Sequence, residues 1–337
     1  MIRYYIEKEN IEKRWDEFIK SNPRANAFQM SLLFDFYLVT TEFRPYYCIA
    51  EDNRTKKIIG GFLFVIQRKG KHFPGNLFLR SLLIGGPLIP SKGEKVLDGL
   101  LKTYNNFAKN KVIYSEIRNL YSWSHHVDVF LKNGFKYESH LNYQISMANK
   151  DIFEAFSKSK KRQIKVAQKN GVQIINNPDI DQIHQFYKIL VKLYKERIYK
   201  PLPDWSFFKS FQDNIVEKEA GKYLLVQYND QIIGGIMLPF YKNKMVYEWY
   251  VAGLDRDFKK AYPSIMATWA GIKYANDHGY ASFDFMGAGI PSQTYGVREF
   301  KSKFGGQLLN FGRFTNSHLW MIHFFIKLFI RLTAKRN

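Results

Sequence analysis

The chain has 337 residues, of which 46% are apolar and 24% are charged. This composition excludes a disordered chain and gives enough length for two domains. Lys and Arg number 51 against 30 Asp and Glu, and the formal charge of +21 favours a polyanionic partner, either nucleic acid, an anionic membrane surface or a phosphorylated substrate. The single cysteine, Cys48, excludes an internal disulfide framework and a cysteine-based zinc cluster.

The first half of the chain begins without an apolar run of signal-peptide length, so we expect a cytoplasmic protein. Residues 47–52 and 58–64 predict two strands joined by a polar turn, and the second strand carries the pair Gly60-Gly61. An amphipathic helix pattern over 96–109 leads into a strand at 112–118. A short signature, Phe-Leu-Lys-Asn-Gly-Phe at 130–135, closes this half.

The second half repeats this order of elements. Strands at 223–228 and 232–238 enclose a polar turn, and the second strand contains Gly234-Gly235, 174 residues after the first such pair. A helix over 264–277, a strand over 281–287 and a closing Lys-Phe-Gly-Gly in 300–306 follow. We interpret the repeat as two copies of one α/β unit with a mixed sheet.

The domain boundary is placed near residue 148, after a predicted strand over 140–147. This gives an N-terminal domain of residues 1–148 and a C-terminal domain of residues 149–337. The second copy carries a helical insert over 179–219, where apolar residues recur at helical spacing.

Three segments of the second half carry a resemblance to a known family: the basic stretch 159–172, the strand end Phe-Asp-Phe-Met-Gly at 283–287, and the closing segment 300–306. The order of elements resembles the GNAT acyltransferase fold, present twice. A tandem chain of this length resembles the Fem family of peptidoglycan-bridge aminoacyltransferases. The resemblance implies two GNAT-like units with mixed sheets and, because 179–219 is short, no long coiled-coil arm.

The resemblance also implies a reaction, in which an amino acid moves from aminoacyl-tRNA to a side-chain amine of a cell-wall precursor. It implies no covalent enzyme intermediate, no cofactor and no metal, with tRNA and a phosphorylated or lipid-linked precursor as partners. The first half departs from the family, because Arg118-Asn119-Leu120 stands where an acid and a proline are common, so Glu116 takes no catalytic role from it.

A second departure concerns the donor. An acyl-CoA enzyme of the GNAT type has a glycine-rich turn that holds the pyrophosphate at a helix N-terminus. The corresponding stretch, 256–264, has no glycine. This weakens the acyl-CoA interpretation, although Ser264 and the helix amides after it could still bind a phosphate.

Two residues are expected to act in catalysis. Lys303 lies in the closing segment, where the resemblance places a cation that stabilises the oxyanion or a donor phosphate; a solvated lysine is the alternative. Asp284 lies between two phenylalanines, where burial would raise its pKa and let it accept a proton or orient the amine. An inert acid capping the next turn is the alternative that the pattern favours, and Glu248 has the same standing.

Substrate binding is expected from a basic helix and the closing segment. Residues 157–171 hold six basic residues and no acid, and their spacing predicts an amphipathic helix with a cationic face for diphosphate or tRNA. The alternative is a merely solvated face. The residues predicted to bind substrate are Arg162, Lys161, Lys165, Tyr250, Tyr262, Arg298, Lys301 and Phe304.

The C-terminal stretch 319–332 is apolar and aromatic, with a narrow polar stripe and no acid. At 14 residues it is too short to span a bilayer. We therefore predict an amphipathic helix over 318–333 that binds an anionic membrane surface, with a helix packed on the core as the alternative. The protein is expected to be a monomer, cytoplasmic or peripheral on the inner face of the membrane.

Two other functions remain open at this point. One is an N-acyltransferase that uses acyl-CoA or an acyl carrier in lipid or surface-polysaccharide synthesis. The other is a non-catalytic nucleic-acid-binding protein that uses the positive charge alone. Transfer that RNase abolishes would indicate the aminoacyl-tRNA donor, and transfer that requires CoA would indicate the N-acyltransferase. Tight RNA binding without transfer would indicate the nucleic-acid-binding protein.

Overall fold

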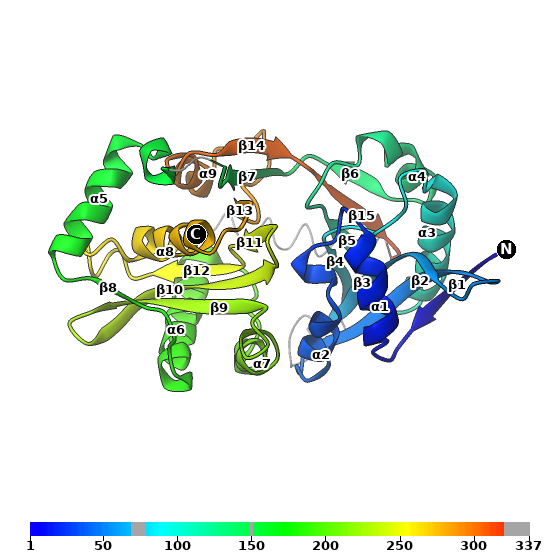
Figure 1. Ribbon diagram of the computed structural model, residues 1–337, viewed down its shortest axis with the longest axis horizontal. Coiled ribbons are helices and arrows are strands. Elements are labelled where there is room, and N and C mark those ends of the chain that lie inside the picture. Colours follow the sequence, from blue (N-terminus) through cyan, green and yellow to red (C-terminus); the bar gives the residue numbers. More distant parts are fainter. Residues whose placement is uncertain (69–78, 149–150, 320–337) are drawn as a thin grey trace. The chain divides into compact units, whose positions relative to one another are not determined.

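The computed structural model describes residues 1–68, 79–148 and 151–319, and its chain forms two compact units (Figure 1). Unit 1 consists of residues 1–139 together with the chain from residue 311, and unit 2 consists of residues 140–310. The helix predicted over 318–333 lies almost wholly outside the described residues. No helix of the described part is long and apolar enough to cross a membrane.

Unit 1 is a mixed sheet covered by helices on both faces. Among the described strands of unit 1, only β4 and β5 pair in parallel, and the other neighbouring strands are antiparallel. Helices α1 (Glu12–Ser21) and α2 (Ser31–Leu38) cover one face, and α3 (Glu94–Ala108) and α4 (Val127–Lys132) cover the other. The strands, in spatial order, are β1 (Ile2–Glu7), β2 (Phe43–Asp52), β3 (Ile58–Arg68), β4 (Leu79–Ile84), β5 (Tyr114–Arg118), β15 (Arg313–Ser317) and β6 (Lys136–Glu138).

Unit 2 is a second mixed sheet of similar design. Helices α5 (Lys158–Lys169) and α8 (Pro263–Asp277) cover one face, and α6 (Ile180–Leu193) and α7 (Trp205–Phe211) cover the other. The strands, in spatial order, are β14 (Gln307–Asn310), β7 (Leu141–Ser146), β13 (Ser282–Asp284), β11 (Met245–Tyr247), β10 (Gln231–Tyr241), β9 (Gly221–Tyr228) and β8 (Gln173–Ile175). A further strand, β12 (Tyr250–Gly253), also pairs with β10.

Shorter helices complete both units. The predicted insert over 179–219 is helical, because π-helical turns at Tyr194–Ile198 and Gln212–Val216 extend α6 and α7. Helix α9 (Gly296–Ser302) precedes β14, and the described residues contain no long coiled-coil arm. Single 3-10 turns lie at Ala27–Gln29, Ser124–His126 and Ile152–Ala155.

The glycine pairs that revealed the repeat have a packing function. Both lie on the second strand of a hairpin, β3 in unit 1 and β10 in unit 2. A Cβ atom at Gly61 would stand 2.9 Å from the Trp15 ring of α1, and one at Gly235 would stand 2.9 Å from the Phe186 ring of α6. In each unit the glycine therefore lets an aromatic side chain lie directly on the strand.

The chain divides at points that differ from the predicted boundary at residue 148. Strand β7 was assigned to the first domain, but it pairs with β13 and β14 and belongs to unit 2. Strand β15 was assigned to the second domain, but it pairs with β5 and β6 and completes the sheet of unit 1. Each sheet thus includes a strand that lies on the other side of the predicted domain boundary at residue 148.

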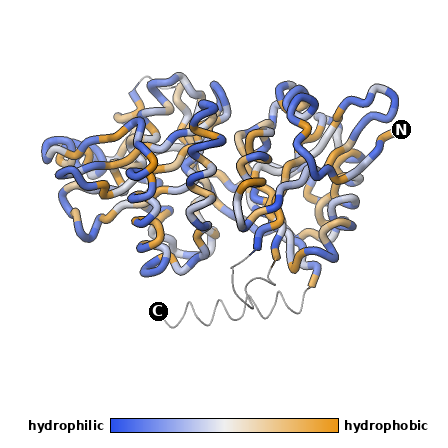
Figure 2. Tube along the Cα trace, turned by 90° about the horizontal axis from the view of Figure 1, so that it is seen from below, coloured by the Kyte–Doolittle hydropathy of each residue, from blue (hydrophilic) through white to orange (hydrophobic). Residues whose placement is uncertain are grey.

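Each unit has its own apolar core between sheet and helices. In unit 1, Leu97 and Leu100 of α3 pack with Phe62 and Phe64 of β3. In unit 2, apolar residues of α5 and α8 pack on β9, β10 and β13. Hydrophilic stretches gather in the outer loops of both units (Figure 2). The strands that carry the candidate functional residues are therefore held rigidly from both faces.

Candidate functional site

Two strands of unit 2 separate at Glu248 and Asp284. Strand β11 pairs in parallel with β13 as far as Tyr247 and Asp284, and the Glu248 N–H then donates to the Asp284 carbonyl at 2.8 Å. Beyond this point β12 continues along β10, whereas the chain after Asp284 pairs with β7. We call the place where the two strands part the fork.

The fork holds three buried ionisable side chains. Glu248 is 3% exposed, Asp284 is 0% exposed and Lys301, from α9, is 7% exposed. The Lys301 ammonium lies 3.3 Å from Oε1 of Glu248 and donates to the carbonyls of Phe285 and Gly287. One ammonium group therefore lies near two carboxyl groups. The three groups together are neutral when one of the carboxyl groups holds a proton.

Asp284 is held by four hydrogen bonds. Asn142 donates to both of its carboxylate oxygens, at 2.9 and 2.8 Å, and Gln144 donates at 2.7 Å. The N–H of Met286 donates at 2.6 Å. Burial raises the pKa of Asp284 above its ordinary value, although the amide donors act in the opposite direction. These partners fix Asp284 as a support for the turn after β13, in line with the capping alternative.

Glu248 is less completely bonded. Thr268 of α8 donates to Oε2 at 3.2 Å, whereas Oε1 has the Lys301 ammonium at 3.3 Å as its polar neighbour in an ion pair. Burial raises the pKa of Glu248, and the nearby Lys301 ammonium opposes this. A buried carboxyl group whose pKa is raised binds a proton more readily than an exposed one, which suits it to accept a proton.

A buried lysine that sequence patterns did not single out lies near the closing segment. Lys160 of α5 is 5% exposed, and its ammonium lies 4.0 Å from the ring centroid of Phe300 and 5.0 Å from that of Phe304. Burial, and then repulsion from Lys303, lower the pKa of Lys160 to about 8. On α5, Lys160 therefore packs in the core, whereas Lys158, Arg162, Lys165 and Lys169 of the predicted cationic face are exposed to solvent.

The other predicted binding residues fall into two groups. Arg162 and Lys165 are exposed on α5 with no ion-pair partner in the described chain, and Lys161 pairs with Glu154 at 2.6 Å. Lys303 is half exposed and pairs with Glu299 at 2.7 Å. These side chains remain on the surface, where a large anionic substrate can reach them.

The second group is structural in its contacts. Arg298 donates to the carbonyls of Ala288, Ile290 and Pro291 and so ties down the loop before α9. Phe304 is fully buried. The remaining two are aromatic: Tyr250 packs against Phe207 and Phe208, and Tyr262 occupies the N-cap of α8 with a left-handed φ of 48°.

A pocket of about 460 Å³ lies beside α9 but does not reach the fork. Tyr143, Arg298, Glu299 and Ser302 line it together with residues 291–296. No group of three or more His, Cys, Asp or Glu side chains in the described ranges is arranged to hold a metal ion.

Comparison with known proteins identifies the architecture. Residues 155–302 match the family model of an acetyltransferase (GNAT) domain, and no curated protein sequence matches the chain. The crystal structure of FemX is 17% identical, with a TM-score of 0.69 over 96% of this chain and 99% of FemX. The structure of L-PGS from Bacillus licheniformis is 11% identical, with a TM-score of 0.59 over 98% of each chain. The chain has a Fem-like tandem GNAT fold.

A tandem GNAT protein from the clavulanic acid biosynthesis pathway has the same tandem GNAT fold at 7% identity, with a TM-score of 0.60 over 94% of this chain and 99% of that protein. At these identities the likeness establishes the fold, including the mixed sheets and two units expected from the sequence. Helix α8 begins at the end of the stretch 256–264, which the resemblance described above matches to the pyrophosphate-binding turn of an acyl-CoA enzyme.

The start of this GNAT helix is closed by the chain itself. Pro263 has no N–H, the Ser264 N–H donates to Oδ1 of Asp255 at 3.1 Å, and the N–H groups of Ile265 and Met266 return to the Tyr262 carbonyl at 3.0 Å. The Ser264 hydroxyl also donates to Asp255. In this structure the Asp255 carboxylate therefore takes the place where Ser264 and the following amides were expected to be able to bind a phosphate.

Proposed function

We propose that the protein is an aminoacyltransferase that moves an amino acid from aminoacyl-tRNA to an amine of a phosphorylated or lipid-linked cell-wall precursor. The observation that carries the proposal is the closed start of α8 in a FemX-like fold. A helix whose first amides are all engaged has no free donors for the CoA pyrophosphate. A donor that does not need this cradle, such as aminoacyl-tRNA, fits the site better.

The donor would be met by the exposed cations of unit 2. Lys303, Arg162 and Lys165 lie at the surface, and Lys160 lies beneath them near Lys303. Exposed basic side chains of this kind bind the phosphates of a nucleic acid without selecting its sequence. We place the end of the charged tRNA here.

The chemistry would take place at the fork, which must open to admit the amine because Glu248 is 3% exposed and the pocket beside α9 does not reach it. The neutral acceptor amine attacks the ester carbonyl carbon of the aminoacyl group, so that a C–N bond forms and the ester C–O bond breaks. Glu248 accepts the proton that the amine loses, and that proton then passes to the leaving ribose oxygen. Lys301 and Asp284 act as positioning residues, because they hold the carboxyl group and the turn around it.

A transfer assay tests the reaction. Purified protein is incubated with charged total tRNA or with acyl-CoA, in the presence of lipid-linked and nucleotide-linked cell-wall precursors. We expect transfer that depends on charged tRNA and is abolished by RNase. Transfer from acyl-CoA that survives RNase treatment would reject the proposed donor.

A variant tests the proposed base. Glu248→Gln keeps the side-chain shape and the oxygen that accepts from Thr268, but it removes the basic carboxylate. We expect kcat to fall by about 10²- to 10⁴-fold with little change in KM, and the acidic limb of the pH profile to disappear. Glu217→Gln, the same change at an exposed position of unit 2, serves as the control. An unchanged pH profile in Glu248→Gln would remove Glu248 from the reaction.

An acyl-CoA-dependent N-acyltransferase is the second candidate. The match of residues 155–302 to the acetyltransferase (GNAT) family model favours it. This function would require Asp255 to leave the start of α8 when the cofactor binds. Protection of the chain by CoA against thermal unfolding would support this candidate over aminoacyl-tRNA.

A further inference from the structure

One end of the unit 1 sheet carries a pocket of about 350 Å³, and no residue of the fork lines it. At this end β2 and β4 begin, β3 ends, and the chain leaves α3 toward β5. We call it the edge pocket. Its lining residues are Thr41, Glu42, Arg44, Tyr46, Ile66, Arg68, Leu79, Asn110 and Lys111.

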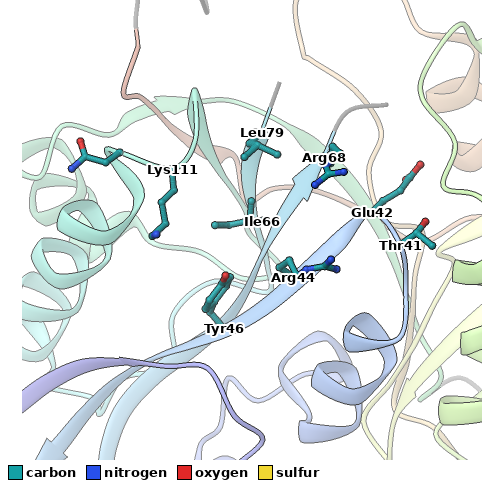
Figure 3. A pocket seen from close by; sticks show the side chains of 9 residues that line it. Thr41, Glu42, Arg44, Tyr46, Ile66, Arg68, Leu79 and Lys111 are labelled. Carbon is teal, nitrogen blue, oxygen red and sulfur yellow. The ribbon is translucent and has the colours of Figure 1, made fainter. Parts of the chain in front are cut away.

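The edge pocket combines positive charge with an apolar floor. Ile66, Leu79 and the Tyr46 ring lie between Lys111 on one side and Arg44 and Arg68 on the other (Figure 3). All three basic side chains are exposed, and Glu42 is the one acidic residue of the lining. This arrangement suits a ligand that carries a phosphate next to an apolar part.

Two further segments of the chain join the described structure at the same end of the sheet. Residues 69–78 connect Arg68 to Leu79, both of which line the edge pocket. The last described residue, Leu319, donates its N–H to the Ile113 carbonyl at 3.1 Å, two residues after Lys111. Residues 320–337 therefore continue from this end as well.

The composition of these two segments indicates what the end of the sheet meets. Together, 69–78 and 320–337 contain six Lys or Arg, six aromatic residues and no Asp or Glu. Aromatic and basic residues without acids are typical of chain that contacts an anionic lipid surface. An RNA site would explain the charge but not the apolar floor and flanking sequences.

We propose that the edge pocket binds the phosphate headgroup of an anionic membrane lipid and so docks this end of unit 1 on the membrane. Arg44, Arg68 and Lys111 receive the phosphate, and the floor formed by Tyr46, Ile66 and Leu79 receives the adjoining glycerol and acyl carbons. The proposal is independent of the transfer reaction, because no edge-pocket residue belongs to the fork.

Vesicle binding by the full chain tests the proposal. The variant Arg44→Gln/Arg68→Gln is compared with Lys13→Gln/Lys20→Gln, which removes the same charge from exposed positions of α1 in the same unit. Sedimentation is measured with phosphatidylcholine vesicles that contain or lack phosphatidylglycerol. We expect the edge-pocket variant to bind the anionic vesicles about ten- to thirty-fold more weakly, and the control to bind like the parent chain. Thermal unfolding verifies that both variants fold, and Lys111→Gln gives an independent reading.

Other ligands predict other outcomes. Equal weakening in both double variants would mean that total charge alone drives binding, and unchanged binding in both would exclude the edge pocket; either result overturns the proposal. Calorimetry with inorganic phosphate provides the soluble arm: phosphate affinity lost in the edge-pocket variant with vesicle binding intact would assign the pocket to a free phosphate instead. A loss confined to binding of total tRNA would assign it to RNA.

Discussion

Each unit has a buried carboxyl group on the strand that follows its long helix, Glu116 on β5 and Asp284 on β13. Both strands follow the long helix of their unit, pair in parallel with an earlier strand, and pair antiparallel with a strand that is distant in the sequence. The surroundings of the two groups are opposite. The comparison therefore shows how the same strand of the two units can hold a buried carboxyl group in two electrostatic environments.

Glu116 is surrounded by cations, whereas Asp284 is surrounded by neutral donors. Burial would raise the pKa of Glu116, but the guanidinium groups around it hold the pKa well below its usual range. Burial prevails at Asp284, whose pKa is raised. The carboxyl group of Glu116 therefore favours its charged form, whereas that of Asp284 favours its protonated form. The nitrogen–oxygen distances to Glu116 are 2.8 Å from Arg313, 3.0 Å from Arg118 and 3.4 Å from Arg80.

The largest loss of stability is expected when the carboxylate among the arginines of unit 1 is removed. Glu116→Gln leaves three arginines facing one another without their anion, and we expect the free energy of unfolding to fall by about 3 kcal/mol. Chemical denaturation measures it. Glu17→Gln, on the exposed face of α1, is the control and should change stability by no more than about 0.5 kcal/mol. Equal stability of the two variants would mean that the arginines reach water and need no anion.

A smaller loss of stability is expected at Asp284, whose hydrogen-bond partners are neutral. Asp284→Asn preserves shape but turns one acceptor into a donor toward Asn142 or Gln144, which leaves buried polar groups unpaired. We expect a loss of about 1–3 kcal/mol in the free energy of unfolding. The exposed change Asp277→Asn on α8 removes a surface ion pair with Lys273 and should cost only a few tenths of a kcal/mol, as expected of such pairs.

The pH dependence of stability sharpens the comparison, because the two carboxyl groups should give slopes of opposite sign. The lowered pKa of Glu116 means that its contribution is present above the unfolded value of 4.5 and is lost as the pH falls. The raised pKa of Asp284 means that its contribution is present below the unfolded value of 3.8 and is lost as the pH rises. The free energy of unfolding is measured for the parent chain and for each variant from acid to neutral pH. The difference between parent and Glu116→Gln should increase with pH, and the difference between parent and Asp284→Asn should decrease.

The smallest expected effect on stability concerns Lys160, a buried cation of unit 2. The pKa of Lys160 is lowered to about 8 from 10.5, so the unfolded chain binds the proton more tightly. Stability of the parent relative to Lys160→Met should therefore rise between pH 8 and 10.5, by about 1 kcal/mol after allowance for solvent screening. Lys158→Met, exposed on the same helix, should show no such rise.

Much of the fold follows from local sequence patterns. The helix predicted over 264–277 is α8, Pro263–Asp277, and the basic helix predicted within 157–171 is α5, Lys158–Lys169. Apolar periodicity and a proline at the first turn mark such elements without knowledge of their neighbours. The assignment of β7 and β15 to sheets could not be predicted in this way, because a strand has the same alternation whichever sheet it joins.

The candidate site was less accessible from sequence. Asp284 and Lys301 were expected in it, but their roles depend on Glu248 and Asn142, which lie far away in the chain. Lys160 was overlooked because a lysine in a basic run has the pattern of a solvated residue, and only the rings of Phe300 and Phe304 give it a place in the core. Predicting these contacts requires knowing which distant elements meet.

Strand β15 has a consequence for how the protein is made. The sheet of unit 1 needs residues 313–317 between β5 and β6, whereas unit 2 consists of the uninterrupted stretch 140–310. During synthesis from the N-terminus, unit 2 can complete its sheet before unit 1 receives its last strand. Until then the edges of β5 and β6 lack their hydrogen-bond partner. The domain that is translated first is therefore the one that is finished last, and nascent chains stalled before residue 313 should expose it to proteases and chaperones.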